Sequence, residues 1–186
     1  MNEYVVLVDE NNQPIGTQPK SEVHHADTPL HRGFSLFVFD ESGNLLIQQR
    51  SANKVTWPLV WSNSFCGHPK LDESPQSAAR RRLSDELNLT VEVIDEVLPD
   101  YRYRSTYRGI CENEFCPVMV TWTENKPRPN PAEVGAIDWI SWSDFVGEIM
   151  KGNDHAYVDF SPWCLEETKL LCESTRFQDL WSQFVG

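Results

Sequence analysis

The sequence predicts a mixed α/β (α+β) fold in which a β-sheet sandwich is flanked by helices. Strand-like apolar segments come both before and after one amphipathic helix, and a further helical segment follows them. This order differs from the regular strand–helix alternation of a parallel doubly wound sheet. With 186 residues, 40% of them hydrophobic, the chain can bury one core. We therefore expect a single domain over residues 1–186.

The first part of the chain predicts a strand, a polar segment and a hairpin. Residues 4–8 are apolar and are followed by turn-forming residues, which predicts a short strand. Residues 20–31 are polar and rich in histidine, and they predict a short helical turn followed by a loop. Residues 34–39 are apolar throughout, which is typical of a buried strand. A turn at 41–44 joins them to residues 45–50, and this pattern predicts a hairpin.

The central helix is predicted over residues 75–87. Ser74 is a favourable N-cap, Pro75 suits the first helical position, and Asn88 suits the C-terminal end. The apolar residues spaced by four along this segment are Ala79, Leu83 and Leu87, which predicts one buried helix face.

The second part of the chain predicts four strands and two helices. The strands are expected over residues 91–98, 101–107, 111–122 and 136–142. A short helix over 143–150 would be capped by Ser143. A longer helix over 162–184 would begin with Pro162.

Charge and cysteine content limit the class of partner. A net charge of −12 argues against binding to nucleic acid, although a local cluster of Lys and Arg could still bind a small phosphorylated molecule. Five cysteines without Cys-x-x-Cys spacing are typical of free thiols. The N-terminus lacks the pattern of a signal peptide, and no apolar stretch is long enough to cross a membrane. We expect a cytoplasmic protein with no membrane partner.

Residues 63–69 hold a thiol and an imidazole two positions apart, at Cys66 and His68. On an extended chain, residues with this spacing face the same side. A single cysteine is more often a small buried hydrophobe than a catalytic group. The neighbouring histidine and the turn at Gly67 favour a chemical role for Cys66.

Five further side chains could bind a metal ion. His24, His31 and His68 supply imidazoles, and Glu112 and Glu114 project from one side of a predicted strand. Such a set, with a sixth position open, suits octahedral Mn²⁺ or Mg²⁺ better than a four-coordinate structural zinc. Spacing alone favours the alternative in which these residues are simply solvated loop and strand-end side chains.

A segment that overlaps the helix predicted over residues 75–87 resembles the Nudix box, a loop–helix–loop motif that binds a divalent metal and a diphosphate. The matching residues are Gly67, Glu73, Arg81, Leu83, Asp85, Glu86 and Leu89. Arg82 stands where the box has a glutamate, Asp85 replaces another glutamate, and Asn88 replaces a glycine. A pyrophosphohydrolase relies on several of the carboxylates of this box for its metals, so these departures argue against hydrolysis.

A wider set of motifs resembles type I isopentenyl-diphosphate isomerase, over residues ~4–175. The motifs are His24-x-Ala26-Asp27-Thr28-x-Leu30-His31, Trp57-Pro58-x-Val60-Trp61-x-Asn63-Ser64-x-Cys66-Gly67-His68-Pro69, Tyr101-Arg102-Tyr103, Glu112-Asn113-Glu114-x-Cys116-Pro117 and Phe160-Ser161-Pro162-Trp163. The resemblance implies a Nudix-type mixed β-sheet sandwich flanked by helices.

The same resemblance implies the reaction and its catalytic residues. The family interconverts isopentenyl diphosphate and dimethylallyl diphosphate by a metal-dependent 1,3-allylic proton shift, a step of isoprenoid biosynthesis. Cys66 and Glu114 would be the opposed proton-transfer groups, and Tyr103 would assist Glu114. Trp163 would place its ring against the carbocation.

The cofactors and diphosphate contacts are likewise implied by resemblance. His24, His31, His68, Glu112 and Glu114 would hold one Mn²⁺ or Zn²⁺ (or Mg²⁺), and a separate Mg²⁺ would join Glu86 to the substrate. The residues that would neutralise the diphosphate are Lys20, Arg50, Lys54 and Arg82. Cys111, Cys164 and Cys172 would be structural, and Cys116 would line the pocket.

Two other hypotheses remain at this point. The chain could be a Nudix pyrophosphohydrolase of a small diphosphate, or a non-catalytic binding domain in which the metal only stabilises the fold. For the isomerase we expect a small allylic or homoallylic diphosphate as the partner, no nucleic acid, no membrane, and a monomer or weak homodimer.

Overall fold

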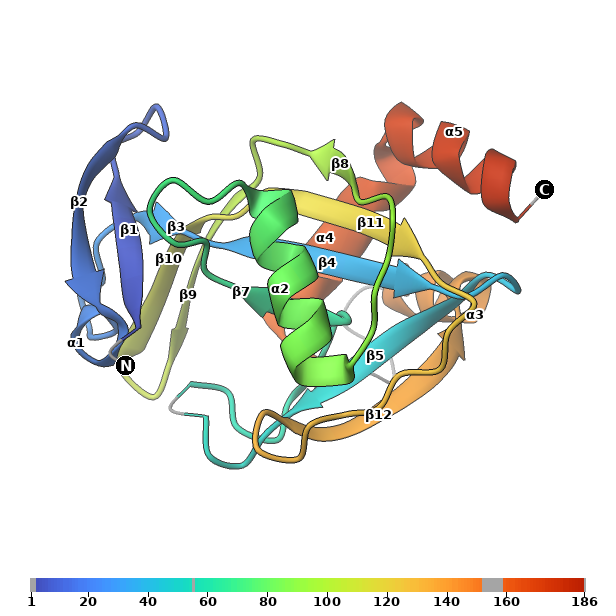
Figure 1. Cartoon of the computed structure of the whole chain (residues 1–186), viewed down its shortest axis with the longest axis horizontal. Coiled ribbons are helices and arrows are strands. Elements are labelled where there is room, and N and C mark those ends of the chain that lie inside the picture. The colour runs from blue at the N-terminus through green and yellow to red at the C-terminus, as the bar shows by residue number, and fades with distance from the viewer. Residues whose placement is uncertain (1–2, 55, 152–158, 186) are drawn as a thin grey trace.

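The strands form two sheets, and helices cover both faces of the larger one (Figure 1). This computed structural model describes residues 3–54, 56–151 and 159–185. The larger sheet has the order β12-β5-β4-β11-β8, with β6 paired to β5 and β7 paired to β4; the smaller has the order β2-β1-β3-β10-β9. The predicted mixed α/β sandwich is confirmed.

The strands of the larger sheet are β4 (Phe34–Phe39), β5 (Asn44–Arg50), β6 (Trp61–Ser62), β7 (Phe65–Gly67), β8 (Asp95–Leu98), β11 (Val118–Trp122) and β12 (Val134–Ser141). Those of the smaller sheet are β1 (Tyr4–Val8), β2 (Pro14–Pro19), β3 (His31–Arg32), β9 (Arg102–Tyr107) and β10 (Ile110–Phe115). The helices are α1 (Lys20–Val23), α2 (Pro75–Leu87), α3 (Trp142–Ile149), α4 (Pro162–Glu173) and α5 (Thr175–Phe184).

Strand β4 is buried on both faces and separates two apolar cores. Phe34, Leu36 and Val38 pack with the apolar face of α2. Phe37 and Phe39 point the other way and pack against α3, α4 and α5. The uninterrupted apolar sequence of this strand follows from this double burial. The predicted hairpin is also present, because β4 pairs with β5 at Phe39 and Leu45.

Helix α2 has the predicted bounds and ends. The Ser74 hydroxyl accepts a hydrogen bond from the Ser77 backbone N–H, which satisfies one free donor of the first turn. Asn88 adopts a left-handed conformation with φ of 51°, and its backbone N–H donates to carbonyls of the last turn. The predicted apolar face is fully buried. Burial of this face fixes the position of α2, and with it the position of the charged residues on the opposite side of the helix.

The prediction of one strand over residues 111–122 is wrong. Cys116 and Pro117 separate β10 from β11, and the two strands belong to different sheets. Pro117 has no N–H to donate, which favours a break in the ladder. Beside this break, the chain also passes from β3 in the smaller sheet to β4 in the larger sheet. The two crossings are held together by backbone hydrogen bonds from the N–H of Gly33 to the carbonyl of Phe115 and from the N–H of Ser35 to that of Pro117. The two sheets therefore meet along this double crossing.

Two helix predictions are also wrong. The helix expected over 162–184 is two helices, because Ser174 leaves the helical conformation and caps α5 by accepting from the Phe177 N–H. Helix α3 is capped by Ser141 and not by Ser143. The hydroxyl of Ser143 instead contacts that of Ser141 at 2.9 Å.

The strand predicted over 91–98 is shorter, because β8 begins at Asp95. Other differences concern short or exposed strands. Strand β2 was not predicted, because it is a solvent-facing edge strand without apolar alternation. Strands β3, β6 and β7 have two or three residues each, too few for a pattern. The helices in the described ranges are all too short and too polar to serve as membrane spans.

Candidate active site

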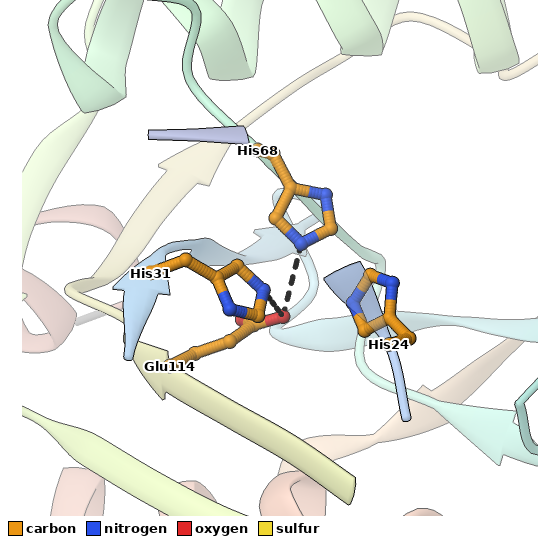
Figure 2. A group of neighbouring side chains, drawn as sticks. All are labelled: His24, His31, His68 and Glu114. Atoms are coloured by element: carbon orange, nitrogen blue, oxygen red, sulfur yellow. Dashed lines mark hydrogen bonds and ion pairs between the residues drawn. The ribbon is translucent and has the colours of Figure 1, made fainter. Parts of the chain in front are cut away.

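Three histidines and a glutamate converge where the smaller sheet meets α1 and the end of β7. His24 ends α1, His31 begins β3, His68 follows β7, and Glu114 lies in β10. Figure 2 shows the three rings grouped around the Glu114 carboxylate. One possible ligand atom from each of the four residues lies within 4.8 Å of those from the others. These four residues form a candidate metal site.

The sheet register explains why these groups meet. His31 and Glu114 are direct partners in the parallel pairing of β3 with β10. Tyr103 is the partner of Glu114 in the antiparallel pairing of β10 with β9. Direct partners on neighbouring strands project to the same face of a sheet. An imidazole, a carboxylate and a phenol therefore stand in one row across three strands.

Backbone carbonyls fix the orientation of two histidine rings. Nδ1 of His31 lies 3.0 Å from the carbonyl oxygen of Pro29, and Nδ1 of His24 lies 3.4 Å from that of Lys20. Because a carbonyl can only accept, each Nδ1 carries a hydrogen, and in the neutral ring each Nε2 presents a lone pair. Metal-binding histidines are commonly held in this way.

The buried ring nitrogens fit a metal ion. Among the described residues, Nε2 of His24 and Nε2 of His31 have no hydrogen-bond partner. Carboxylate oxygens nevertheless lie nearby, Glu112 Oε2 at 3.1 Å from His24 and Glu114 Oε1 at 3.6 Å from His31. A buried polar atom without a partner is costly unless something else binds it. Lone pairs of imidazoles beside a carboxylate form a donor set that a divalent transition metal prefers.

Glu112 lies beside the group of four rather than within it. One of its oxygens faces His24, and the other accepts a hydrogen bond of 2.7 Å from the Thr56 hydroxyl. Glu112 is therefore placed at the edge of the site, and its predicted role as a fifth ligand stays a prediction.

The charges inside the group favour an ionised Glu114. Burial opposes ionisation, but the neighbouring imidazoles of His31 and His68 hold the pKa of Glu114 well below its usual range. Burial lowers the pKa of His68. Burial also acts to lower the pKa of His31, but the Glu114 carboxylate outweighs it and raises that pKa. The carboxylate is thus available to a cation at neutral pH.

The Cys66 thiol lies in β7, where its sulfur contacts polar side chains. Its sulfur lies 3.3 Å from the Ser35 hydroxyl and 3.3 Å from the Asn63 side-chain oxygen. Burial raises the pKa of Cys66 to about 12, so the thiol carries its proton at neutral pH. Burial, together with the charge of Glu114, likewise raises the pKa of Tyr103 well above its usual range.

Aromatic rings form one wall of this region. The Trp163 ring lies 5.5 Å from that of Tyr103 and 5.2 Å from that of Trp57, measured between centroids. The Arg50 guanidinium lies over the Trp163 ring at 5.6 Å from its centroid. The face of Trp163 is therefore already in contact with a cation.

Three of the predicted phosphate-binding cations lie close to Glu86. Arg50 and Lys54 line a cavity of about 20 Å³ together with Cys66 and Glu86. Arg82 forms an ion pair of 2.5 Å with Glu86, one turn along α2. Arg82 and Lys54 also share the carboxylate of Glu133, at 3.2 and 2.9 Å.

Lys20 lies outside that lining. It forms an ion pair of 2.8 Å with Glu3, so its role in diphosphate binding stays a prediction. A larger cavity, of about 390 Å³, lies beside the start of α2, and its lining contains none of the predicted catalytic or metal-binding residues. Cavity size alone would therefore not have identified the region that contains Cys66 and Glu86.

Two buried or half-buried carboxylates at the site were not predicted. Glu133 follows a proline-rich loop and has no motif around it. Glu167 was detectable in principle, because it lies four residues after Trp163 and so on the same helix face. Of the cysteines, Cys116 lies 3.6 Å from the Ser35 hydroxyl, and its place in the pocket lining stays a prediction.

The fold and the site define a Nudix-domain protein. The NUDIX domain family matches residues 29–164. A protein of known structure from Deinococcus radiodurans is similar over 90% of this chain and 98% of its own, with a TM-score of 0.67 at 20% identity. A MutT protein from Methanosarcina mazei is similar over 76% of this chain and 94% of its own, with a TM-score of 0.56 at 17% identity.

Relatives that match most of this chain identify the family within the Nudix-domain proteins. The isopentenyl-diphosphate Delta-isomerase of Saccharopolyspora erythraea is 45% identical over 172 residues, or 92% of this chain and 87% of the relative. That of Agromyces mediolanus is 46% identical over 170 residues, or 91% and 81%. The chain belongs to the isopentenyl-diphosphate Delta-isomerase family, which confirms the resemblance drawn from its motifs.

Proposed function

We infer that this chain interconverts isopentenyl and dimethylallyl diphosphate by a 1,3-allylic proton shift. The observation that carries this function is the arrangement around Tyr103. Glu114 is its cross-strand partner, and the charge of Glu114 acts on both the Tyr103 phenol and the Cys66 thiol. A carboxylate and a thiol thus border one buried region, together with the aromatic wall. The relatives' shared activity supports the same reaction.

The resting protonation states suit a two-group mechanism. Cys66 holds a proton and Glu114 is ionised, so one group is ready to donate and the other to accept. In one direction the thiol protonates the terminal alkene carbon, and the carboxylate removes the allylic proton. In the reverse direction the two roles exchange. Tyr103 would orient the carboxylate from the neighbouring strand.

The candidate metal site would serve the acceptor group. His24, His31, His68 and Glu114, with Glu112 as a fifth ligand, would hold Mn²⁺ or Zn²⁺, with Mg²⁺ as a third possibility. A bound divalent ion would keep the Glu114 carboxylate ionised and fix its direction.

A second ion, Mg²⁺, would join Glu86 to the substrate diphosphate. Arg50, Lys54 and Arg82 would neutralise the phosphate oxygens, and Lys20 would approach from the end of β2. In the structure, Lys54 and Arg82 form ion pairs with Glu133. A bound diphosphate would replace the Glu133 carboxylate as their partner. Trp163 would shelter the carbocation, a contact worth about 2 kcal/mol when water is excluded.

The reaction can be tested directly by proton NMR of isopentenyl diphosphate in deuterated buffer. We expect conversion to dimethylallyl diphosphate with uptake of deuterium, and loss of conversion after treatment with a chelator. Cys66→Ala and Glu114→Gln should lower turnover by at least ~100-fold with the fold retained. Cys172→Ala, at a cysteine packed at the far end of α4, is the matched control. Near-normal turnover by Cys66→Ala would show that the proton assignment is wrong.

The hydrolase alternative is less favoured by the geometry. The Glu73–Arg81 pair of the Nudix box is present, with contacts of 2.9 and 2.7 Å. Arg82, however, occupies one face of the Glu86 carboxylate. Release of phosphate from nucleoside diphosphates with Mg²⁺ would be the sign of that activity, and we expect none.

Three further expectations are proposals. We place the enzyme in the reducing cytoplasm because its five cysteines are all free. We propose that residues 1–186 act as one domain and that the protein is a monomer or weak homodimer.

A further inference from the structure

A buried carboxyl group on α4 has no place in the mechanism given above. Glu167 is fully buried. In the described part of the chain, the hydrogen-bond partner of its carboxyl group is the neutral hydroxyl of Ser35. A carboxylate in such surroundings is normally neutralised by a cation or by a proton. Here burial raises the pKa of Glu167 well above its usual range, which favours the neutral acid.

Ser35 connects this acid to the sulfur of Cys66. The Ser35 hydroxyl lies 2.6 Å from Oε1 of Glu167 and 3.3 Å from Sγ of Cys66. Ser35 is itself fully buried in β4. A serine hydroxyl can donate one hydrogen bond while it accepts another. The three groups therefore form a continuous hydrogen-bonded path from α4, through β4, to β7.

The path works with its hydrogens in either orientation. With a protonated carboxyl, Glu167 donates to Ser35, and Ser35 donates toward the sulfur. With an ionised carboxyl, the thiol donates to Ser35, and Ser35 donates to Glu167. Both orientations satisfy the same two contacts without movement of a heavy atom. The second oxygen of Glu167 has no hydrogen-bond partner in the described residues, which favours the neutral acid at rest.

We propose that Glu167 is a positioning residue for Cys66 that acts through Ser35 and stores the proton exchanged on that face of the substrate. This inference rests on the isomerase function proposed above. It supplies what that reaction needs, since a shift that uses two opposed groups leaves one of them short of a proton after each conversion.

The proton step balances as follows. After the sulfur has given its proton to the substrate, the O–H bond of Glu167 breaks as a new O–H bond forms on Ser35. The original O–H bond of Ser35 breaks as an S–H bond forms on Cys66. The negative charge thereby moves from sulfur to the Glu167 carboxylate. That carboxylate regains a proton from solvent, and Glu114 releases the one it accepted.

Glu167→Gln is the central test, because glutamine keeps the shape and can accept from Ser35 but cannot store the proton. We expect kcat to fall by roughly tenfold or more while KM stays within about twofold, as for a group that acts in proton transfer only. Ser35→Ala should give a similar fall, and the double variant should be no slower than either, since the two residues act as one path. Glu166→Gln, whose carboxylate accepts from the Tyr101 hydroxyl, is the control and should be unaffected.

An infrared spectrum separates proton storage from a merely structural role. The wild type should show the carbonyl stretch of a buried protonated carboxylic acid. This band should shift in deuterated buffer, should be absent in Glu167→Gln and should persist in Glu166→Gln. An active wild type with unchanged kcat in Glu167→Gln, or without that band, would overturn the inference and leave the isomerase function standing. A wild type that does not convert isopentenyl diphosphate would overturn both.

Discussion

At the residue scale, Gly33 leaves the space that the Glu114 carboxylate occupies. A Cβ added at Gly33 would lie 1.9 Å from Oε2 of Glu114 and 3.4 Å from Sγ of Cys116. The first distance is far below any tolerable contact. Glycine is therefore required here for the close approach of a side chain and not for its backbone conformation.

Gly33→Ala should displace the Glu114 carboxylate and lower turnover by at least about tenfold, because the proton acceptor is moved from its place. Metal content, measured by atomic emission after gel filtration, should fall as well. Gly16→Ala is the control, since an added Cβ there meets nothing within 4 Å. Full activity and metal content in Gly33→Ala would contradict this reading of the site.

Glu167 also predicts how stability changes with pH. An unfolded glutamate loses its proton near pH ~4.3, whereas the folded protein keeps the proton to higher pH because burial raises the pKa of Glu167. Between those two pKa values the unfolded state binds fewer protons, so rising pH lowers the free energy of unfolding. Glu167→Gln lacks this contribution. Its stability relative to wild type in urea should therefore increase from pH 4 to pH 7, and a constant difference would contradict the prediction.

Site residues that lie in motifs could be predicted from the sequence, whereas isolated site residues could not. His24, His31, His68 and Glu114 were predicted as neighbours, and the structure brings them together. Glu133 and Glu167 were not predicted, because a single carboxylate in a loop or helix is usually solvated. Only the fold shows that one carboxylate bridges two cations and the other is buried.

At the element scale, the sequence predicted strands and helices by their apolar periodicity and failed where a break depends on tertiary contacts. Residues 111–122 are apolar enough for one strand, but β10 and β11 pair with different partners on either side of Pro117. The helical pattern of 162–184 is likewise interrupted at Ser174, where a second capping hydroxyl starts α5. Helix α2, with clear signals at both ends, was predicted to the residue.

The cap of α2 gives a prediction at this scale. Ser74→Ala should lower the free energy of unfolding by ~1 kcal/mol, because the Ser77 N–H loses its acceptor. Turnover should change little, since the residues of α2 that face the site lie two turns further along. Ser84→Ala, at an exposed position inside the same helix, should cost nothing and serves as the control. Equal urea midpoints for both variants would exclude the capping role.

At the scale of the whole molecule, the fold class was predictable but the arrangement of the sheets was not. The order of strands and helices indicated a mixed sandwich, and the family resemblance indicated its type. The meeting of two sheets at Gly33 and Cys116–Pro117 depends on pairings between distant segments, such as β3 with β10. Nothing local in the sequence specifies such a pairing.

Because the candidate metal ligands come from four separate segments, metal removal should loosen the whole molecule. A ligand present at 100 times its dissociation constant stabilises the folded state by about 2.7 kcal/mol. We expect chelation to lower the midpoint of thermal unfolding, and re-addition of Mn²⁺ or Zn²⁺ to restore it. His31→Ala should have a low midpoint from the start and respond little to chelator. His25→Ala, whose ring accepts from the Asp27 backbone, should respond like wild type. A wild-type midpoint indifferent to chelator would argue against a structural contribution from the ion.

The spread of those ligands along the chain has a consequence during biosynthesis. His24 and Glu114 are 90 positions apart (114 − 24), and residues emerge from the ribosome in order. A nascent polypeptide that has exposed only the three histidines lacks the Glu114 carboxylate of the set. The four candidate ligands are therefore complete only after more than half of the protein has been translated, and we expect the ion to be bound after that point.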